Sequence, residues 1–413
     1  LSIDSETSPI PIGQGANAGI NTVYSGGTNF NHEISEKTEI NGNYFFSSFK
    51  REVDRTSRRQ DFLSDGSSFV SEQASKDDSG NRNHRMDITL DHKFDSLQSI
   101  RIRSSIRFSA NEANNTSGSA LYGIDGLLAN EGQNMNLSEG SQNNWEASAL
   151  YKRKLGKPGR TISVDAAIRL NDRNQDGRLE ALNSFFEGGL LQDELLIDQD
   201  RIQEEQVQSF NSGLSYTEPL GKRRYLEWNY YFQQMQQDAS QEVYDEGAAG
   251  TPGMLNQQLS NHYISDYLYH KAGMNFLLNR EKFNFSVGIN LQQSSLDGHL
   301  VLSDTYIRQD FSNWLPTFSF DYSFDNSHNT RIFYGTSMRE PSIRELQPIL
   351  DNANPLSLYI GNPELKPEYQ HRLNWNYLFF DQFSYLNIFA NVSMQYTENK
   401  IQYAQTIDDQ FVR

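Results

Sequence analysis

Runs of residues in which apolar and polar side chains alternate are the feature that most limits how this chain can fold. In the clearest run, IRIRSSIRF at 100–108, Ile100, Ile102, Ile106 and Phe108 alternate with arginines and serines. Successive side chains of a β-strand point to opposite faces of the sheet, so a period of two predicts a strand with one apolar and one polar face. No segment shows a competing helical period, and the chain is predicted to be all-β.

The alternating runs come in pairs that flank short polar turns. Fourteen runs form seven hairpins, with turns at residues 36–37, 95–96, 157–159, 220–221, 279–280, 326–327 and 381–382. Six longer polar segments separate the hairpins, near 52–82, 112–140, 173–203, 236–262, 293–312 and 338–366. Short turns on one rim and long loops on the other are typical of outer-membrane β-barrels. A soluble sandwich or propeller is the alternative all-β interpretation, but its connections are usually short throughout.

Charge and hydropathy exclude two other classes of protein. The 413 residues include 53 acidic and 36 basic side chains, for a net charge of −17, whereas nucleic-acid binding requires a basic face. The mean hydropathy is −0.70 and no apolar run reaches the roughly 18 residues of a transmembrane helix. A β-barrel tolerates a polar average because its strands alternate, and the 25 Phe and 21 Tyr suit interfacial girdles.

Prolines predict a stiff loop between two strands in the last quarter of the chain. The alternation that passes through Tyr334 must end near Arg339, because Pro341 and Pro348 follow and proline cannot donate to a β-ladder. Alternation resumes over residues 373–379. The segment is therefore predicted to be a strand, a proline-stiffened loop and a second strand, with the loop on the extracellular side.

This segment resembles a known family. TSMREPSIRELQP at 336–348 and IGNPELKPEYQH at 360–371 are similar to the mid-barrel signature of TonB-dependent outer-membrane receptors, in particular the barrels of Bacteroidetes-type receptors. The likeness extends over nearly the whole chain and includes YTEPLGKRRYLEWNYYF at 216–232. The residues that carry the signature are Arg339, Pro341, Ser342, Leu346, Pro348, Gly361, Asn362, Pro363, Leu365, Lys366, Pro367 and Glu368.

The resemblance implies a fold and a location. It implies a transmembrane antiparallel β-barrel of about 22 strands in the bacterial outer membrane. Residues 17–413 are expected to supply about 14 of those strands as a partial barrel domain, with residues 1–16 as a connector. Because no plug domain is recognisable and the last residue is not aromatic, the chain is expected to be an internal piece of a longer protein.

The resemblance also implies a function. Receptors of this family bind scarce nutrients at extracellular loops and import them with energy passed through TonB to a plug inside the barrel. The expected partners are therefore outer-membrane lipid, a small nutrient ligand, and TonB through a plug domain that is absent from this chain. The alternative is a non-transporting binding or scaffold barrel, such as an adhesin or a complex partner. Siderophore, cobalamin, glycan and peptide all remain open as substrates.

One segment has the spacing of a calcium loop, DRNQDGRLEALN at 172–183. Its candidate ligands are Asp172, Asn174, Asp176 and Glu180. A complete loop has a bidentate Glu at its twelfth position, which is Asn183 here, and helices flank it, whereas strand patterns flank this one. A hydrogen-bonded turn is the preferred interpretation, and no tight calcium binding is expected.

No arrangement of residues predicts catalysis or a cofactor. The chain has no GxSxG elbow and no HExxH spacing, and Ser337 with His328 or His371 is a pairing that any serine-rich chain offers. The acid-rich run at 192–206 is interpreted as a solvated face. The arginines of 100–108 are expected to face the barrel interior and to pair with carboxylates such as Asp87, Asp91 and Asp165. The chain is not expected to be an enzyme.

Overall fold

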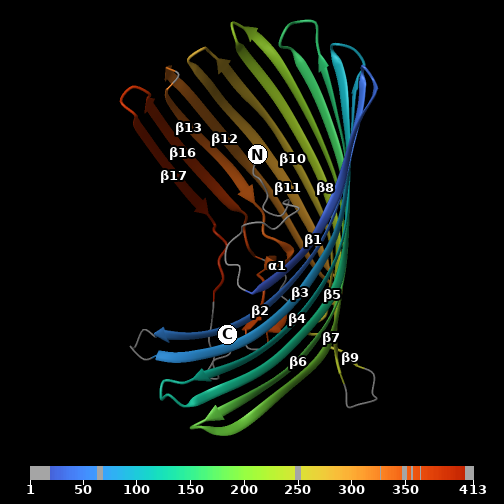
Figure 1. Cartoon of the computed structure of the whole chain (residues 1–413), viewed down its shortest axis with the longest axis vertical. Helices are drawn as coiled ribbons and strands as arrows, with labels where there is room; N and C mark the ends of the chain where they lie inside the picture. The colour runs from blue at the N-terminus through green and yellow to red at the C-terminus, as the bar shows by residue number, and fades with distance from the viewer. Residues whose placement is uncertain are drawn as a thin grey trace.

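The computed structural model describes residues 19–62, 68–246, 253–325, 327–346, 351–354, 357–362 and 364–404. The predicted connector at 1–16 therefore lies outside the described residues. Within them the chain forms one large antiparallel sheet that curves around a hollow side (Figure 1). No helical segment in the described part of the chain has the length and apolar character needed to span a bilayer.

Fourteen strands of this sheet follow one another in chain order, each hydrogen-bonded to the next, as the seven predicted hairpins require. They are β1 (Ile20–Ser35), β2 (Thr38–Phe62), β3 (Ser68–Lys93), β4 (Gln98–Tyr122), β5 (Leu128–Lys154), β6 (Thr161–Glu187), β7 (Leu190–Gly221), β8 (Arg224–Asp245), β10 (Asn261–Asn279), β11 (Phe283–Leu300), β12 (Thr305–Asp325), β13 (His328–Arg339), β16 (Glu368–Asp381) and β17 (Leu386–Glu398). The short β9 (Met254–Leu255) pairs with β8. The remaining elements are α1 (Ile343–Leu346), β14 (Asp351–Asn354) and β15 (Ser357–Tyr359).

The sheet does not close on itself among the described residues. β1 pairs only with β2, and β17 pairs only with β16, so each end strand keeps one free edge. The molecule is therefore an open arc of a barrel wall.

Five of the seven predicted short turns lie where the pattern placed them, the turn at 326–327 lies partly outside the described residues, and one prediction is wrong by two residues. β7 continues through Leu220-Gly221, and the turn is formed by Lys222 and Arg223 with φ of 46° and 62°. Two central residues with positive φ characterise a type I′ hairpin turn, whose twist matches that of the flanking strands. The glycine that suggested a turn occupies the last position of the strand, where its own φ is 92°.

The prediction of six long polar loops is wrong for most of their length. The segments near 52–82, 112–140 and 173–203 are almost entirely strand, and β6 and β7 meet at Gly188-Gly189. β7 has 32 residues, whereas about 9–11 residues of a tilted strand cross a bilayer, so most of this strand projects beyond the membrane. Outside the bilayer both faces meet water, and the apolar alternation disappears although the backbone pairing continues.

The two faces of the sheet differ in chemistry. Figure 1 shows α1 on the hollow side, which we call the concave face; the opposite side is the convex face. Exposed apolar side chains gather on the convex face near the short turns, as with Ile102, Phe108 and Ile168. On the concave face Arg101 donates to Asp91 at 2.6 Å. The predicted division of 100–108 into an apolar and an arginine face is thus confirmed.

A small core lies on the concave face beneath the segment that follows β13. Tyr263, Leu300 and Ile307 form a buried cluster, and Leu346 of α1 is 1% exposed. The backbone oxygen of Leu365 accepts a hydrogen bond from Gln309 of β12 at 3.3 Å. The loop predicted at 338–366 therefore lies at the end of β13 away from its short turn, but it folds back over the inner wall.

Candidate functional site

The proline-stiffened loop begins with a single helical turn, and a sequence motif marks where this turn starts. Ser342 and Glu345 form a capping box: the Ser342 backbone N–H donates to Glu345 Oε2 at 2.7 Å, and the Glu345 N–H donates to Ser342 Oγ at 3.4 Å. Each residue thereby satisfies an otherwise unpaired donor of the other. The buried Pro341 directly precedes this turn, where its missing N–H leaves no ladder bond unmade.

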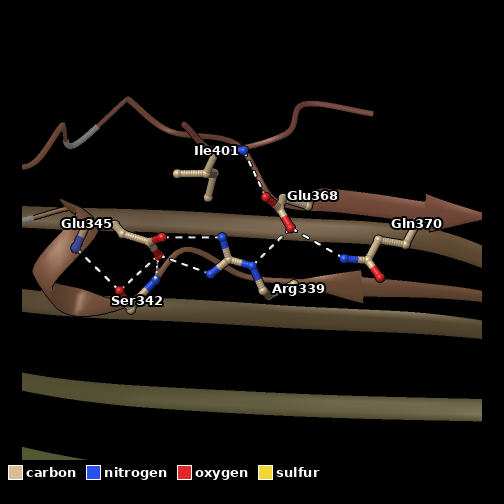
Figure 2. A network of polar contacts seen from close by, with 6 residues as sticks. All are labelled: Arg339, Ser342, Glu345, Glu368, Gln370 and Ile401. Carbon is tan, nitrogen blue, oxygen red and sulfur yellow. Dashed lines mark hydrogen bonds and ion pairs between the residues drawn. The ribbon is translucent and has the colours of Figure 1, made fainter. Parts of the chain in front are cut away.

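Arg339 ties this helical turn to the returning strand. Its Nε donates to Glu368 Oε2 at 3.0 Å, and its two terminal nitrogens donate to the carboxylate of Glu345 at 3.2 and 3.3 Å (Figure 2). Arg339 and Glu368 are direct partners in the pairing of β13 with β16. We call these contacts the arginine clasp, because one guanidinium joins the strand end, the helical turn and the next strand.

The clasp fixes the charges of its carboxylates. The hydrogen bond from Arg339 outweighs burial and, with the Ile401 N–H at 2.8 Å, holds the pKa of Glu368 at about 2. Burial favours the neutral form of Glu345, but the hydrogen bonds from Arg339 and Ser342 prevail and lower the pKa of its carboxyl. The clasp lies at the last residue of β13, beyond the part of that strand that crosses the bilayer.

The second half of the signature fastens the loop to its surroundings. The Asn362 N–H donates to the Glu345 backbone oxygen at 2.7 Å, and Asn362 Oδ1 accepts from the Glu364 N–H at 2.9 Å. The backbone oxygen of Pro367, which is buried, accepts from Asn399 at 3.5 Å. Gly361 is half-buried and Lys366 is exposed. Pro348 and Pro363 lie outside the described residues.

Glu340 is a site residue that the sequence reasoning missed. Its Oε1 accepts hydrogen bonds from Tyr267 at 2.7 Å, Gln292 at 3.2 Å and Ser294 at 3.3 Å. No ion pair to Glu340 occurs within the described ranges, so three neutral donors of β10 and β11 hold this carboxylate on the inner wall. Burial and the bond to Glu340 raise the pKa of Tyr267. The sequence feature that could have identified Glu340 is its position between the end of a predicted strand and a proline.

The predicted turn at 172–183 is wrong, because these residues continue β6 as regular strand. Asp172, Asn174, Asp176 and Glu180 share the convex face, where strand geometry spreads them over about 26 Å. They cannot converge on one ion in that conformation. Across the described residues no group of three or more His, Asp or Glu side chains could hold a metal ion.

The other predicted contacts are distributed as follows. Of the carboxylates expected to pair with the arginines of 100–108, Asp91 does so, whereas Asp87 binds Arg85 at 2.8 Å. Asp165 forms no ion pair in the described part of the chain. Register places Ser337 opposite Gln370 and His371 opposite Thr336, so Ser337 and His371 lie on opposite faces of the sheet. The acid-rich run at 192–206 lies within β7, where Asp198 binds Arg178 at 3.0 Å.

Comparison with known proteins identifies a matching protein family and similar solved structures. Residues 153–412 match the outer membrane protein beta-barrel family. No curated protein matches the chain. Among solved structures, the unliganded ferric citrate transporter FecA has 9% sequence identity and a TM-score of 0.46, with 89% of this chain and 50% of that chain covered. The outer membrane protease OmpT from Escherichia coli has 11% identity and a TM-score of 0.24, with 69% of this chain and 96% of that chain covered.

The chain thus spans about half the length of the FecA chain. The family match covers more than half of the present chain and agrees with the antiparallel sheet, whose apolar side chains gather on one face. The protein is located in the bacterial outer membrane. The chain belongs to the outer membrane protein beta-barrel family.

Proposed function

We propose that this chain is the wall of an outer-membrane receptor that imports a nutrient with energy delivered through TonB. The observation that carries the proposal is the arginine clasp, in which residues of the receptor-like signature hold the loop after β13 against the concave face. A loop held there lies on the inner wall of the barrel mouth, where a ligand entering from outside must pass it. In this proposal the nutrient binds at the extracellular side.

The open arc supports a wide barrel. Unpaired backbone groups at the edges of a sheet cost several kcal/mol each in lipid, so β1 and β17 need further strands as partners. Barrels wider than about 16 strands enclose a channel or a plugged lumen. The proposal therefore includes a plug domain outside this chain as the contact to TonB. It assigns the chain no enzymatic activity, no cofactor and no nucleic-acid partner.

Uptake in living cells tests this proposal. In cells that carry the full-length gene, we expect uptake of the cognate nutrient to be lost when TonB is deleted, while the nutrient still binds. Arg339→Gln should reduce uptake. Arg331→Gln, which changes another arginine of β13 and breaks its exposed ion pair with Asp321 of β12, should not. Uptake that is unchanged without TonB for every ligand that binds would point to a binding or scaffold barrel.

A further inference from the structure

Three tyrosine–histidine pairs recur on the convex face at one distance from the short turns. Their tyrosines are each the seventh residue of a strand: Tyr44 of β2, Tyr230 of β8 and Tyr334 of β13. Their hydroxyl groups lie 2.8, 2.8 and 2.9 Å from Nδ1 of His84, His270 and His371, respectively. Aromatic girdles flank the apolar band of outer-membrane barrels, which is about 25 Å tall. Counted from the short turns, His84 and His270 are the tenth residues of their strands and His371 is the eleventh, which matches the roughly 9–11 residues that cross a bilayer. We therefore take the histidines of these pairs as the outer boundary of that band.

An amphipathic groove lies on the convex face at the same level. The groove has a volume of about 410 Å³ and is lined by residues of β4 to β7. Its side toward the short turns is apolar, with Ile106, Trp145 and Leu170. Its other side carries Asn143 and Asp172, which stand in register with Phe108 and through it with His84. A groove whose membrane side is apolar and whose outer side is polar matches a lipid at the outer boundary, which has apolar acyl chains and a polar headgroup.

Arg82 lies one step beyond His84 on the same face of β3. It is exposed, and it forms no ion pair with any residue that the structure describes. Its cross-strand neighbours, Ser48 and Ala110, are small and leave the guanidinium accessible. The next cation, Lys50, is already bound to Glu52 at 2.9 Å. Arg82 is therefore a cation at the membrane boundary whose partner the described chain does not supply.

We propose that Arg82 and His84 bind the phosphate of an outer-leaflet lipid whose acyl chain lies in the adjacent groove. Arginine binds phosphate through two parallel N–H donors. A lipid phosphate lies at the membrane boundary, at the same depth as the Arg82 guanidinium, and can therefore form this pair. The hydrogen bond between the Tyr44 hydroxyl and Nδ1 of His84 leaves Nε2 of the ring for the same ligand. Glu112 and Asp172 also face this surface, and the Glu112 carboxylate lies over Gly80 of β3, on the side of Arg82 away from His84. The phosphate therefore lies on the opposite side of Arg82, toward His84. This inference is independent of the proposed transport.

Lipid retention by the full-length protein tests the site. The protein purified in mild detergent is titrated with phosphorylated lipid A, and bound lipid is counted by native mass spectrometry. We expect Arg82→Gln to reduce bound lipid several-fold and His84→Ala to reduce it less. Arg107→Gln is the matched control, because it removes the same charge from the concave face of the neighbouring strand, and it should bind as the unmodified protein does.

Three further arms distinguish the ligand and the fold. Dephosphorylated lipid A should bind the unmodified protein as weakly as phosphorylated lipid A binds the Arg82→Gln variant. Trp145→Ala should weaken lipid binding although Arg82 is unchanged. Inorganic phosphate at millimolar concentration should not displace the lipid. Equal retention by Arg82→Gln and the unmodified protein, an equal loss in Arg107→Gln, or displacement by free phosphate would each overturn the proposal. Circular dichroism of each variant, unchanged from the unmodified protein, shows that the sheet is intact.

Discussion

At the scale of single residues, the loop after β13 depends on a few carboxylates whose partners come from distant parts of the chain. Glu368 is almost completely enclosed, with 8% of its side chain exposed, and Arg339 supplies its countercharge. Glu340 instead relies on three neutral donors. The capping box was readable from the sequence, because Ser342 and Glu345 are local. The partners of Glu340 were not, because they depend on the register of strands about 50 to 70 residues away.

Glu368→Gln is expected to loosen the loop at neutral pH. Loss of a hydrogen bond to a charged group costs about 1.5–3 kcal/mol, so hydrogen exchange of residues 340–346 should accelerate at pH 7. Because the folded pKa of about 2 lies below the ordinary value of 4.5, the native carboxylate stabilises the loop above pH 4.5 and loses this effect as the pH falls through 2. The variant and the native protein should therefore converge near pH 2.

Asp321→Asn is the matched control for this measurement. It removes a carboxylate of β12 that pairs with Arg331 of β13, close to the short turn. Exchange of residues 340–346 should not change in this variant. Equal acceleration in both variants at pH 7 would show that β13 responds as a whole and that the clasp has no local role.

At the scale of elements, the strand count and most turns could be predicted because both signals are local. Alternation near the membrane marks each strand, and turn residues mark each hairpin, as at Asp95-Ser96 and Asp381-Gln382. The strand lengths could not be predicted, because side chains beyond the bilayer are polar on both faces. Gly188-Gly189, with φ of 58° and 80°, marks the true end of the longest hairpin. The Tyr–His pairs likewise required the register between strands.

Ile102→Arg tests the assignment of the convex face in β4. An arginine on the lipid face near the bilayer midplane costs about 2–4 kcal/mol, so folding into lipid vesicles should be weakened by that amount. Arg103→Gln, at the next position on the concave face, should change the free energy of folding little. Urea unfolding in vesicles gives both values. A larger loss for Arg103→Gln would reverse the faces.

At the scale of the whole molecule, the open arc decides what the chain does alone. Expressed without further strands, residues 1–413 are expected to aggregate or to leak small solutes, because the edges of β1 and β17 stay unpaired in lipid. Dye release from vesicles measures the leak, with the full-length protein as the control. A chain that inserts, seals the vesicle and resists protease by itself would contradict this expectation.

The projection of the strands beyond the bilayer has a consequence for how the protein can change over generations. Below the Tyr–His pairs, each side chain on the convex face contacts lipid, and a charged side chain there costs about 2–4 kcal/mol at the midplane. This cost falls to about 0–1 kcal/mol near the interface, and above the pairs both faces of the same strands stand in water. The hydrogen-bonded ladder continues through both regions. One sheet thus joins a base in which lipid restricts substitution to a rim in which water permits it.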